Sequence, residues 1–203
     1  MDTQTSNLHE VRLDHVASLL IHSAAESVLD LGCGSGALLQ RCLQMGHFER
    51  LVGLESSGIS LRNARERLQH WLQQPDPRVQ LVRGSFQEPN PACTGFDAAA
   101  MVEVIEHVPP RDLSTVERAV FEYFRPGKVV ITTPNADYNP LFDLSPGELR
   151  DPDHRFEWSR DKFRQWVGGV ASRNGYRVRT GGIGEADPEL GAPTQTAWFE
   201  RLG

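Results

Sequence analysis

Two carboxylates and one imidazole lie within a stretch of five residues, Glu103-Val-Ile-Glu106-His107. If this stretch forms a helical turn, positions i, i+3 and i+4 share one face, so the three side chains converge. Two carboxylates with a neutral imidazole suit a divalent cation such as Mg²⁺ or Mn²⁺. Taken alone, the segment leaves two interpretations open, a metal site or a polar turn that holds no metal.

His154 lies in a second polar stretch, Asp153-His-Arg-Phe-Glu-Trp-Ser-Arg160. A helix is expected to begin just after it, with Ser159 as the N-cap residue. A histidine in such a stretch is exposed to solvent by default. As a fourth ligand it would instead complete a site of two glutamates and two histidines.

A glycine-rich turn, Asp30-Leu-Gly-Cys-Gly-Ser-Gly36, follows a short apolar run. Gly32, Gly34 and Gly36 permit positive φ angles and a close approach of a ligand to the backbone. Their spacing lacks the third glycine position of the dinucleotide fingerprint and the Gly-Lys-Ser/Thr of a phosphate loop, which weakens a nicotinamide or nucleoside-triphosphate interpretation. Glu55 follows Asp30 by 25 residues, and an acid at the end of a second strand can accept hydrogen bonds from both ribose hydroxyls of a nucleoside cofactor.

These groups need a scaffold, and the hydrophobic pattern supplies one. Strands are expected at residues 27–31, 50–55, 79–82, 96–102, 128–132, 176–180 and 194–200, and helices around 8–20 and at 37–44, 61–73, 113–124 and 159–174. Alternation of strand and helix predicts an α/β fold with a mostly parallel sheet covered on both faces. Such a sheet binds ligands beyond the carboxyl ends of its strands. The length of 203 residues predicts one domain, 1–203, with residues 134–157 as an ordered loop or insertion.

The segment Val28-Leu-Asp-Leu-Gly-Cys-Gly-Ser-Gly36, together with Glu55, resembles the cofactor motif of class I S-adenosylmethionine-dependent methyltransferases. The resemblance implies a Rossmann-like fold with a seven-stranded sheet. It also implies that Asp30 and the three glycines line the methionine end of S-adenosylmethionine. Ser85 and Phe86, after the third strand, would border its adenine.

Three further segments resemble the 3′-terminal RNA ribose 2′-O-methyltransferase family, which modifies small regulatory RNAs in eukaryotes and repaired RNAs in bacteria. They are Glu103 to His107, Thr132-Thr-Pro-Asn-Ala-Asp-Tyr-Asn139, and His154-Arg-Phe-Glu-Trp-Ser-Arg160. The resemblance implies a divalent metal, Mg²⁺ or Mn²⁺, held by Glu103, Glu106, His107 and His154. Either of the two histidines could also act in catalysis by helping to remove a proton.

The implied substrate is the 3′ end of an RNA, because only a terminal ribose offers both its hydroxyls to one metal ion. Six side chains could shape a pocket for the terminal nucleotide: Tyr138, Asn139, Phe142, Arg155, Phe156 and Trp158. Alternatively, Phe156 and Trp158 merely anchor their loop to the core. Phe163 and Trp166, spaced i and i+3, are expected in the core.

Two other functions compete with this interpretation. A small-molecule methyltransferase of quinone-biosynthesis type shares the cofactor motif and the Glu-x-x-Glu-His segment, and it needs no metal. A non-catalytic RNA-binding module derived from a methyltransferase is the other, but no key acid or ligand is lost here. Among bacterial members, the resemblance further implies an RNA end-healing and ligase partner.

Composition excludes other classes of protein. Hydrophobic residues at 39% and charged residues at 24% are ordinary for a globular chain and exclude a disordered one. No run of 18 apolar residues exists, and the first residues have no basic-then-apolar signal, so no association with a membrane is expected. Three cysteines without a Cys-x-x-Cys pair favour a reducing, cytoplasmic location.

The formal net charge of −6 argues only against a protein that coats duplex nucleic acid. Residues 150–180 carry eight basic against four acidic side chains, almost all of the basic ones arginine. Arginine forks onto phosphates and stacks on bases. We expect this basic block to lie beside the terminal-ribose site.

Overall fold

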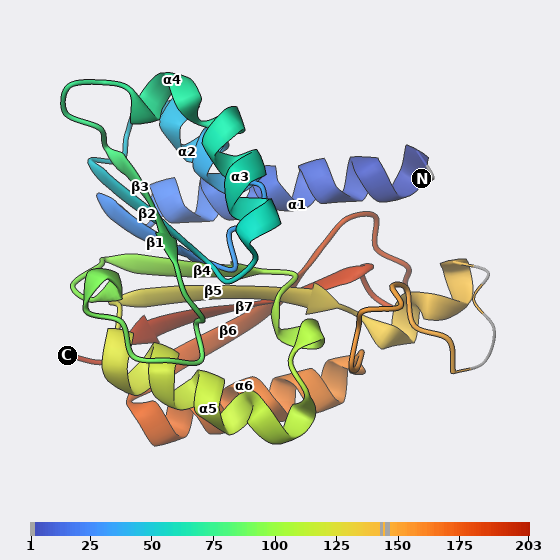
Figure 1. Ribbon diagram of the computed structural model, residues 1–203. Helices are drawn as coiled ribbons and strands as arrows, with labels where there is room; N and C mark the ends of the chain where they lie inside the picture. Colours follow the sequence, from blue (N-terminus) through green and yellow to red (C-terminus); the bar gives the residue numbers. More distant parts are fainter. Residues whose placement is uncertain (1–2, 143, 145–146) are drawn as a thin grey trace.

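The structure is a computed structural model that describes residues 3–142, 144 and 147–203 (Figure 1). A seven-stranded sheet runs through the molecule in the order β3-β2-β1-β4-β5-β7-β6. The strands are β1 (Ser27–Leu31), β2 (Arg50–Glu55), β3 (Val79–Arg83), β4 (Ala98–Val102), β5 (Lys128–Pro134), β6 (Tyr176–Ile183) and β7 (Thr194–Arg201). All neighbouring strands pair in parallel except β7, which is antiparallel to both β5 and β6. The expected α/β fold with a mostly parallel sheet is confirmed.

Helices cover both faces of the sheet (Figure 1). On one face lie α1 (Thr3–His22), α2 (Ala37–Met45), α3 (Gly58–Arg67) and α4 (Gln69–Leu72). On the other face lie α5 (Leu113–Glu117), continued by a π-helical segment, η4 (Arg118–Phe124), and α6 (Arg160–Asn174). Each face has its own apolar core, because the central strands are buried on both sides.

Two helices differ from their expected form. The helix predicted at 61–73 starts earlier, at Gly58, where the Ser57 side chain accepts a hydrogen bond from Ser60 N, and it is interrupted at Leu68. The helix predicted at 113–124 changes from α to π geometry at Arg118. Both changes arise within continuous apolar patterns, so periodicity alone does not reveal them.

The segment between β5 and α6 is tied to the sheet at both of its ends. It contains the short 3₁₀ helix η5 (Ala136–Phe142), and Asn135 forms an isolated parallel bridge with Trp158. Arg155 N donates a hydrogen bond to Glu106 O at 2.7 Å, which fixes the segment over the loop that follows β4. This segment therefore forms a wall at the carboxyl edge of the parallel strands. No helix of the described residues has the length and apolar character needed to cross a membrane.

Candidate active site

The glycine turn after β1 presents an open stretch of backbone. Gly32 and Gly36 have φ of 77° and 76°, and a Cβ added to Gly32 would lie 2.9 Å from Val104 Cγ2. Gly34 also has a positive φ, 53°, but a Cβ added there would have no heavy atom within 4 Å. The turn thus packs closely at its ends and leaves space at its centre, where a ligand can approach the backbone.

Two carboxylates flank this turn. Glu55, at the end of β2, accepts hydrogen bonds from Gly34 N at 3.0 Å and Ser57 N at 2.7 Å. Asp30 is 2% exposed, and its Oδ2 has no partner among the described residues. Burial, with a smaller contribution from the charge of Glu55, raises the pKa of Asp30 to about 7. The raised pKa indicates that the Asp30 carboxylate has no nearby cation or hydrogen-bond donor to stabilise its charge.

Ser85 and Phe86 lie near the same turn, as predicted from their position after β3. Gly84 N donates to Glu55 O at 3.1 Å, which fixes the start of their loop against β2. The Phe86 ring would lie 3.7 Å from a Cβ on Gly32. All the predicted cofactor residues therefore gather at one edge of the sheet, around the ends of β1, β2 and β3.

A second group of polar side chains follows β4. One ligand atom each of Glu106, His107 and His154 lie within 4.8 Å of one another. Glu106 is fully buried, and while its Oε2 accepts a hydrogen bond from Thr133 Oγ1 at 3.0 Å, its Oε1 has no partner among the described residues. Burial, and then the charge of Glu103, raises the pKa of Glu106 well above its usual value. A buried carboxylate beside two imidazoles, with one oxygen unpartnered, fits a divalent cation.

His154 is held in a defined orientation by an acid. Its Nδ1 lies 2.6 Å from Glu157 Oε1, which leaves Nε2 for another partner. Burial alone would raise the pKa of Glu157, but hydrogen bonds from His154, Asn139 and Arg150 N hold it below its usual value. The His107 ring packs edge-on against His154, with centroids 4.9 Å apart. Histidine ligands of metals are commonly oriented by a carboxylate in this way.

Glu103 does not share a helical face with the other two residues of its segment, so that expectation was wrong. Its φ is +53°, and the helical turn that follows is a 3₁₀ helix, η2 (Ile105–His107). The Glu103 carboxylate accepts a hydrogen bond from Thr132 Oγ1 at 2.9 Å and pairs with Arg12 at 3.1 Å. It nevertheless lines the same cavity, of about 360 Å³, as His107 and His154. Three of the four predicted ligands therefore lie together, and the fourth faces the same space.

Comparison with known proteins shows to which family this chain belongs. A family described as a methyltransferase domain matches residues 29–130. The small RNA 2′-O-methyltransferase of Mus musculus is 36% identical over 205 residues, which cover 97% of this chain and 51% of the mouse protein. The crystal structure of the methyltransferase domain of bacterial CtHen1-C has a TM-score of 0.87 and 39% identity, covering 97% of this chain and 100% of that one. The chain belongs to the small RNA 2′-O-methyltransferase family.

Several members of the small RNA 2′-O-methyltransferase family are longer than this chain. The protein of Tetrahymena thermophila is 33% identical and is covered to 52%, so this chain spans about half the length of the curated relatives it matches. The crystal structure of the small RNA methyltransferase HEN1 superimposes with a TM-score of 0.89 at 30% identity, with 26% of its chain covered. A chain of the Pnkp1/Rnl/Hen1 RNA repair complex, at 19% identity and a TM-score of 0.73, shares the fold. The fold is that of S-adenosylmethionine-dependent methyltransferases, as expected.

Several residues around the candidate active site were not predicted from the sequence. Arg12 of α1 is 8% exposed, and besides Glu103 it contacts Thr194 Oγ1 at 3.2 Å. Arg150, largely buried, donates to Asn139 Oδ1 at 2.7 Å and Pro193 O at 2.7 Å, and burial lowers its pKa to about 10. Neither arginine lies in a recognisable motif. Glu157 could have been found, because it follows His154 by three residues in the same polar stretch.

Most of the aromatic side chains near the site belong to the core. Phe156 and Trp158 are buried and stack on each other with centroids 4.2 Å apart, which confirms the alternative that they anchor their loop. Phe163 is buried and Trp166 packs against the same core, as expected. Phe142 lines the cavity that holds His107 and His154. A pocket for the terminal nucleotide therefore depends on Phe142 and its neighbours rather than on the stacked pair.

The basic block of residues 150–180 does not form one patch beside the site, contrary to expectation. Arg173 pairs with Glu117, and Arg177 and Arg179 pair with Glu200. Arg173 lies in the last turn of α6 and Arg177 near the start of β6, at the end of the strands away from the cavity. The reversal of the chain between α6 and β6 separates charges that are adjacent in sequence.

Proposed function

We propose that this chain transfers a methyl group from S-adenosylmethionine to the 2′-hydroxyl of the 3′-terminal ribose of RNA. A divalent metal, Mg²⁺ or Mn²⁺, is bound by Glu103, Glu106, His107 and His154. The convergence of Glu106, His107 and His154, with a buried carboxylate oxygen that lacks a donor, carries this proposal. Family membership supports the same activity.

The cofactor lies along the glycine turn in this proposal. Asp30, Gly32, Gly34 and Gly36 line its methionine end, and the unpartnered Asp30 oxygen accepts from the amino group there. The Glu55 carboxylate accepts from the ribose hydroxyls. Ser85 and Phe86 border the adenine, since their loop starts at Glu55 O.

A divalent cation supplies charge that lowers the pKa of a bound hydroxyl and fixes its position. The chain's own residues prepare its site. Thr133 orients the Glu106 carboxylate, and Glu157 orients the His154 ring through Nδ1. An imidazole nitrogen of His107 or His154 that is not bound to the cation would accept the proton that leaves the 2′-oxygen. A free terminal ribose is preferred because only that ribose presents both of its hydroxyls to one site.

Labelled methyl transfer to three RNAs tests the proposal. They end in a 3′-hydroxyl, a 3′-phosphate or a 2′-deoxyribose, and each is assayed with Mn²⁺ and with a chelator. We expect transfer only to the 3′-hydroxyl RNA with metal present, and a product that resists periodate because its vicinal diol is blocked. Transfer that persists in chelator, or a product that stays sensitive to periodate, would contradict the proposal.

The same assay separates the two remaining alternatives. A small-molecule methyltransferase would transfer to none of the three RNAs, with or without metal. A non-catalytic RNA-binding module would bind them without transfer. A partner that heals or ligates RNA ends remains a prediction, and co-purification with such an enzyme from the same cells would test it.

A further inference from the structure

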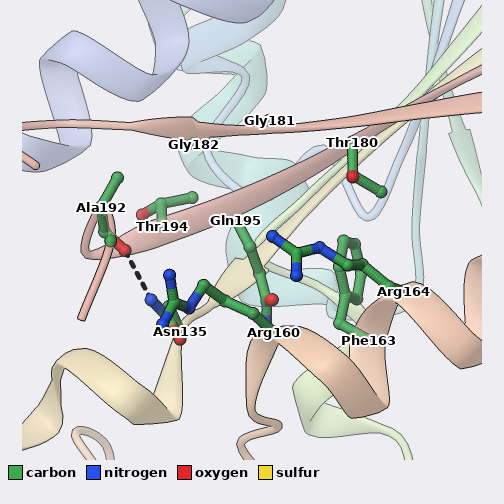
Figure 2. Close-up of a pocket in the computed structure, with 11 residues that line it drawn as sticks. Asn135, Arg160, Phe163, Arg164, Thr180, Gly181, Gly182, Ala192, Thr194 and Gln195 are labelled. Atoms are coloured by element: carbon green, nitrogen blue, oxygen red, sulfur yellow. Dashed lines mark hydrogen bonds between the residues drawn. The ribbon is translucent and has the colours of Figure 1, made fainter. Parts of the chain in front are cut away.

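A second cavity, of about 240 Å³, lies between the first turns of α6 and the neighbouring ends of β6 and β7 (Figure 2). Its wall includes Asn135, whose neighbour Pro134 lines the cavity of the predicted metal ligands. Arg12, in the wall of that first cavity, donates a hydrogen bond at 3.2 Å to Thr194 Oγ1 in the wall of the second, so the two cavities lie close together. The proposed function makes no use of the second one.

Gln195 places an unused acceptor in this second cavity. The residue is 4% exposed, and its Nε2 donates to Pro134 O at 3.0 Å and Trp158 O at 2.9 Å. Because carbonyl oxygens only accept, these two bonds fix which end of the amide is nitrogen. The other end, Oε1, is buried and has no donor among the described residues. A buried acceptor of this kind calls for a donor from elsewhere.

Gly182 lines the same cavity and packs so closely against Ala192, another lining residue, that a side chain there would have to displace Ala192. Gly182 is the register partner of Gln195 in the antiparallel pair of β6 and β7, so a side chain there would point to the same face. A Cβ at Gly182 would lie 2.6 Å from the Ala192 Cβ. The buried ring of Phe163 forms an apolar wall of the same cavity (Figure 2). The cavity thus combines the flat apolar surface of Phe163 with an acceptor, Gln195 Oε1, that has no donor among the described residues.

Of the two arginines in the cavity wall, Arg164 is the one whose guanidinium is largely uncommitted. Arg160 is bound by Asp137 at 3.0 Å and by Glu189 O at 2.7 Å. The Arg164 side chain is 57% exposed, and its only hydrogen bond to a described residue is a long one, 3.4 Å to Asp161. Arginine binds phosphates through its fork of donors.

We propose that this cavity binds a nucleotide upstream of the 3′-terminal one in the same RNA strand. A base N–H donates to Gln195 Oε1, and Arg164 contacts the phosphate of that nucleotide. Every base carries an N–H donor, so the cavity reads the presence of a nucleotide and not its identity. This inference rests on the proposed function, because it takes RNA as the substrate.

Substrates of increasing length, from a single nucleoside 5′-monophosphate, which has no upstream nucleotide, to longer single-stranded RNAs, all with free 3′-hydroxyls, test the inference in the intact chain. KM and kcat are measured for each, and RNA binding is measured separately by fluorescence anisotropy without cofactor. The test variants are Arg164→Ala and Gly182→Ala. The control is Arg177→Ala. Arg177 lies on the same strand as Gly182 but at the other end of that strand, and its side chain is 70% exposed.

For the longer RNAs, we expect Arg164→Ala to raise KM and Kd about tenfold, as loss of one charged hydrogen bond would do, and Gly182→Ala to raise both by narrowing the cavity. With the nucleoside 5′-monophosphate, kcat and KM stay at the wild-type values, which also shows that the variants are folded. If Gly182→Ala does not fold, Arg164→Ala decides alone. If KM and Kd of the variants fall with RNA length as much as those of the wild type, this inference is overturned. If the wild-type chain methylates no RNA, the proposed function is overturned instead.

Discussion

Three acids of the candidate site are kept from water in three different ways. Asp30 is buried with an unpartnered oxygen, Glu106 is buried with one oxygen bonded to Thr133, and Glu103 is paired with Arg12. The arrangements of Asp30 and Glu106 are unfavourable without a further positive charge or donor, because each leaves one buried oxygen unpartnered. We therefore expect the free energy of unfolding to be higher when cofactor and metal are bound than in the ligand-free protein.

Asp30 provides a test through pH. Its pKa is about 7 in the folded chain and close to 3.8 when unfolded, so the folded state binds more protons between these values. Stability from this group is therefore present at low pH and is lost as pH rises toward 7. We expect the ligand-free protein to melt at a lower temperature at pH 8 than at pH 5.5. Asp30→Asn should reduce this difference, measured by thermal denaturation at the two pH values. If the melting temperature of the variant depends on pH as strongly as that of the wild type, the buried Asp30 carboxyl is not the cause of the dependence.

The ligand residues give a graded series. Glu103→Ala and His154→Ala should abolish methyl transfer while cofactor binding, measured by calorimetry, stays near that of the wild type. Glu157→Gln keeps the ligand but weakens its orientation, so metal affinity should fall about 10- to 100-fold. His70→Ala, an exposed histidine away from the site, serves as the control. Full activity of either alanine variant would exclude that residue from the proposed metal site.

At the scale of elements, the sequence predicted every strand of the sheet, because short apolar runs bounded by glycine, proline and polar residues mark buried parallel strands clearly. The polar residues near strand ends were predictable for the same reason: Glu55 closes the apolar run of β2, and Asp30 lies one residue before the end of β1. The geometry of Glu103 was not predictable, since a left-handed residue leaves no periodic signal. Arg12 was equally hidden, because its partners Glu103 and Thr194 are distant in sequence.

Arg12 ties α1 to the rest of the molecule, and this link can be measured. It joins α1 to the start of β7 through Thr194 and to the end of β4 through Glu103. Arg12→Met should lower the free energy of unfolding by roughly 2 kcal/mol in metal-free protein, because it leaves a largely buried carboxylate without its cation. Chemical denaturation in chelator measures this loss. Arg62→Met, an exposed arginine of α3, should change stability little, and equal losses in both variants would argue against a specific link.

At the scale of the whole molecule, several arginines of the basic block are engaged by groups of the protein itself and are not free to meet RNA. They include Arg150, Arg160 and Arg173. Binding should therefore involve few phosphates, in keeping with a net charge of −6.

The salt dependence of RNA binding reports that number. If roughly two phosphates are neutralised, affinity for a single strand should fall only about sevenfold between 50 and 200 mM salt. Anisotropy titrations across this range measure the slope. A fall of a thousandfold would instead indicate extensive contact with the backbone, which the paired arginines do not support.

The left-handed backbone at Glu103 has a consequence for how this protein can change over generations. A residue other than glycine at φ of +53° costs about 1 kcal/mol, and here it is held by hydrogen bonds from its N–H to Thr132 O and Oγ1. Glycine would relieve that cost, but it would leave the buried Arg12 guanidinium without its anion, which costs more. A laboratory library ranked on melting temperature alone would thus keep glutamate at this position, even in members that had lost activity through changes elsewhere.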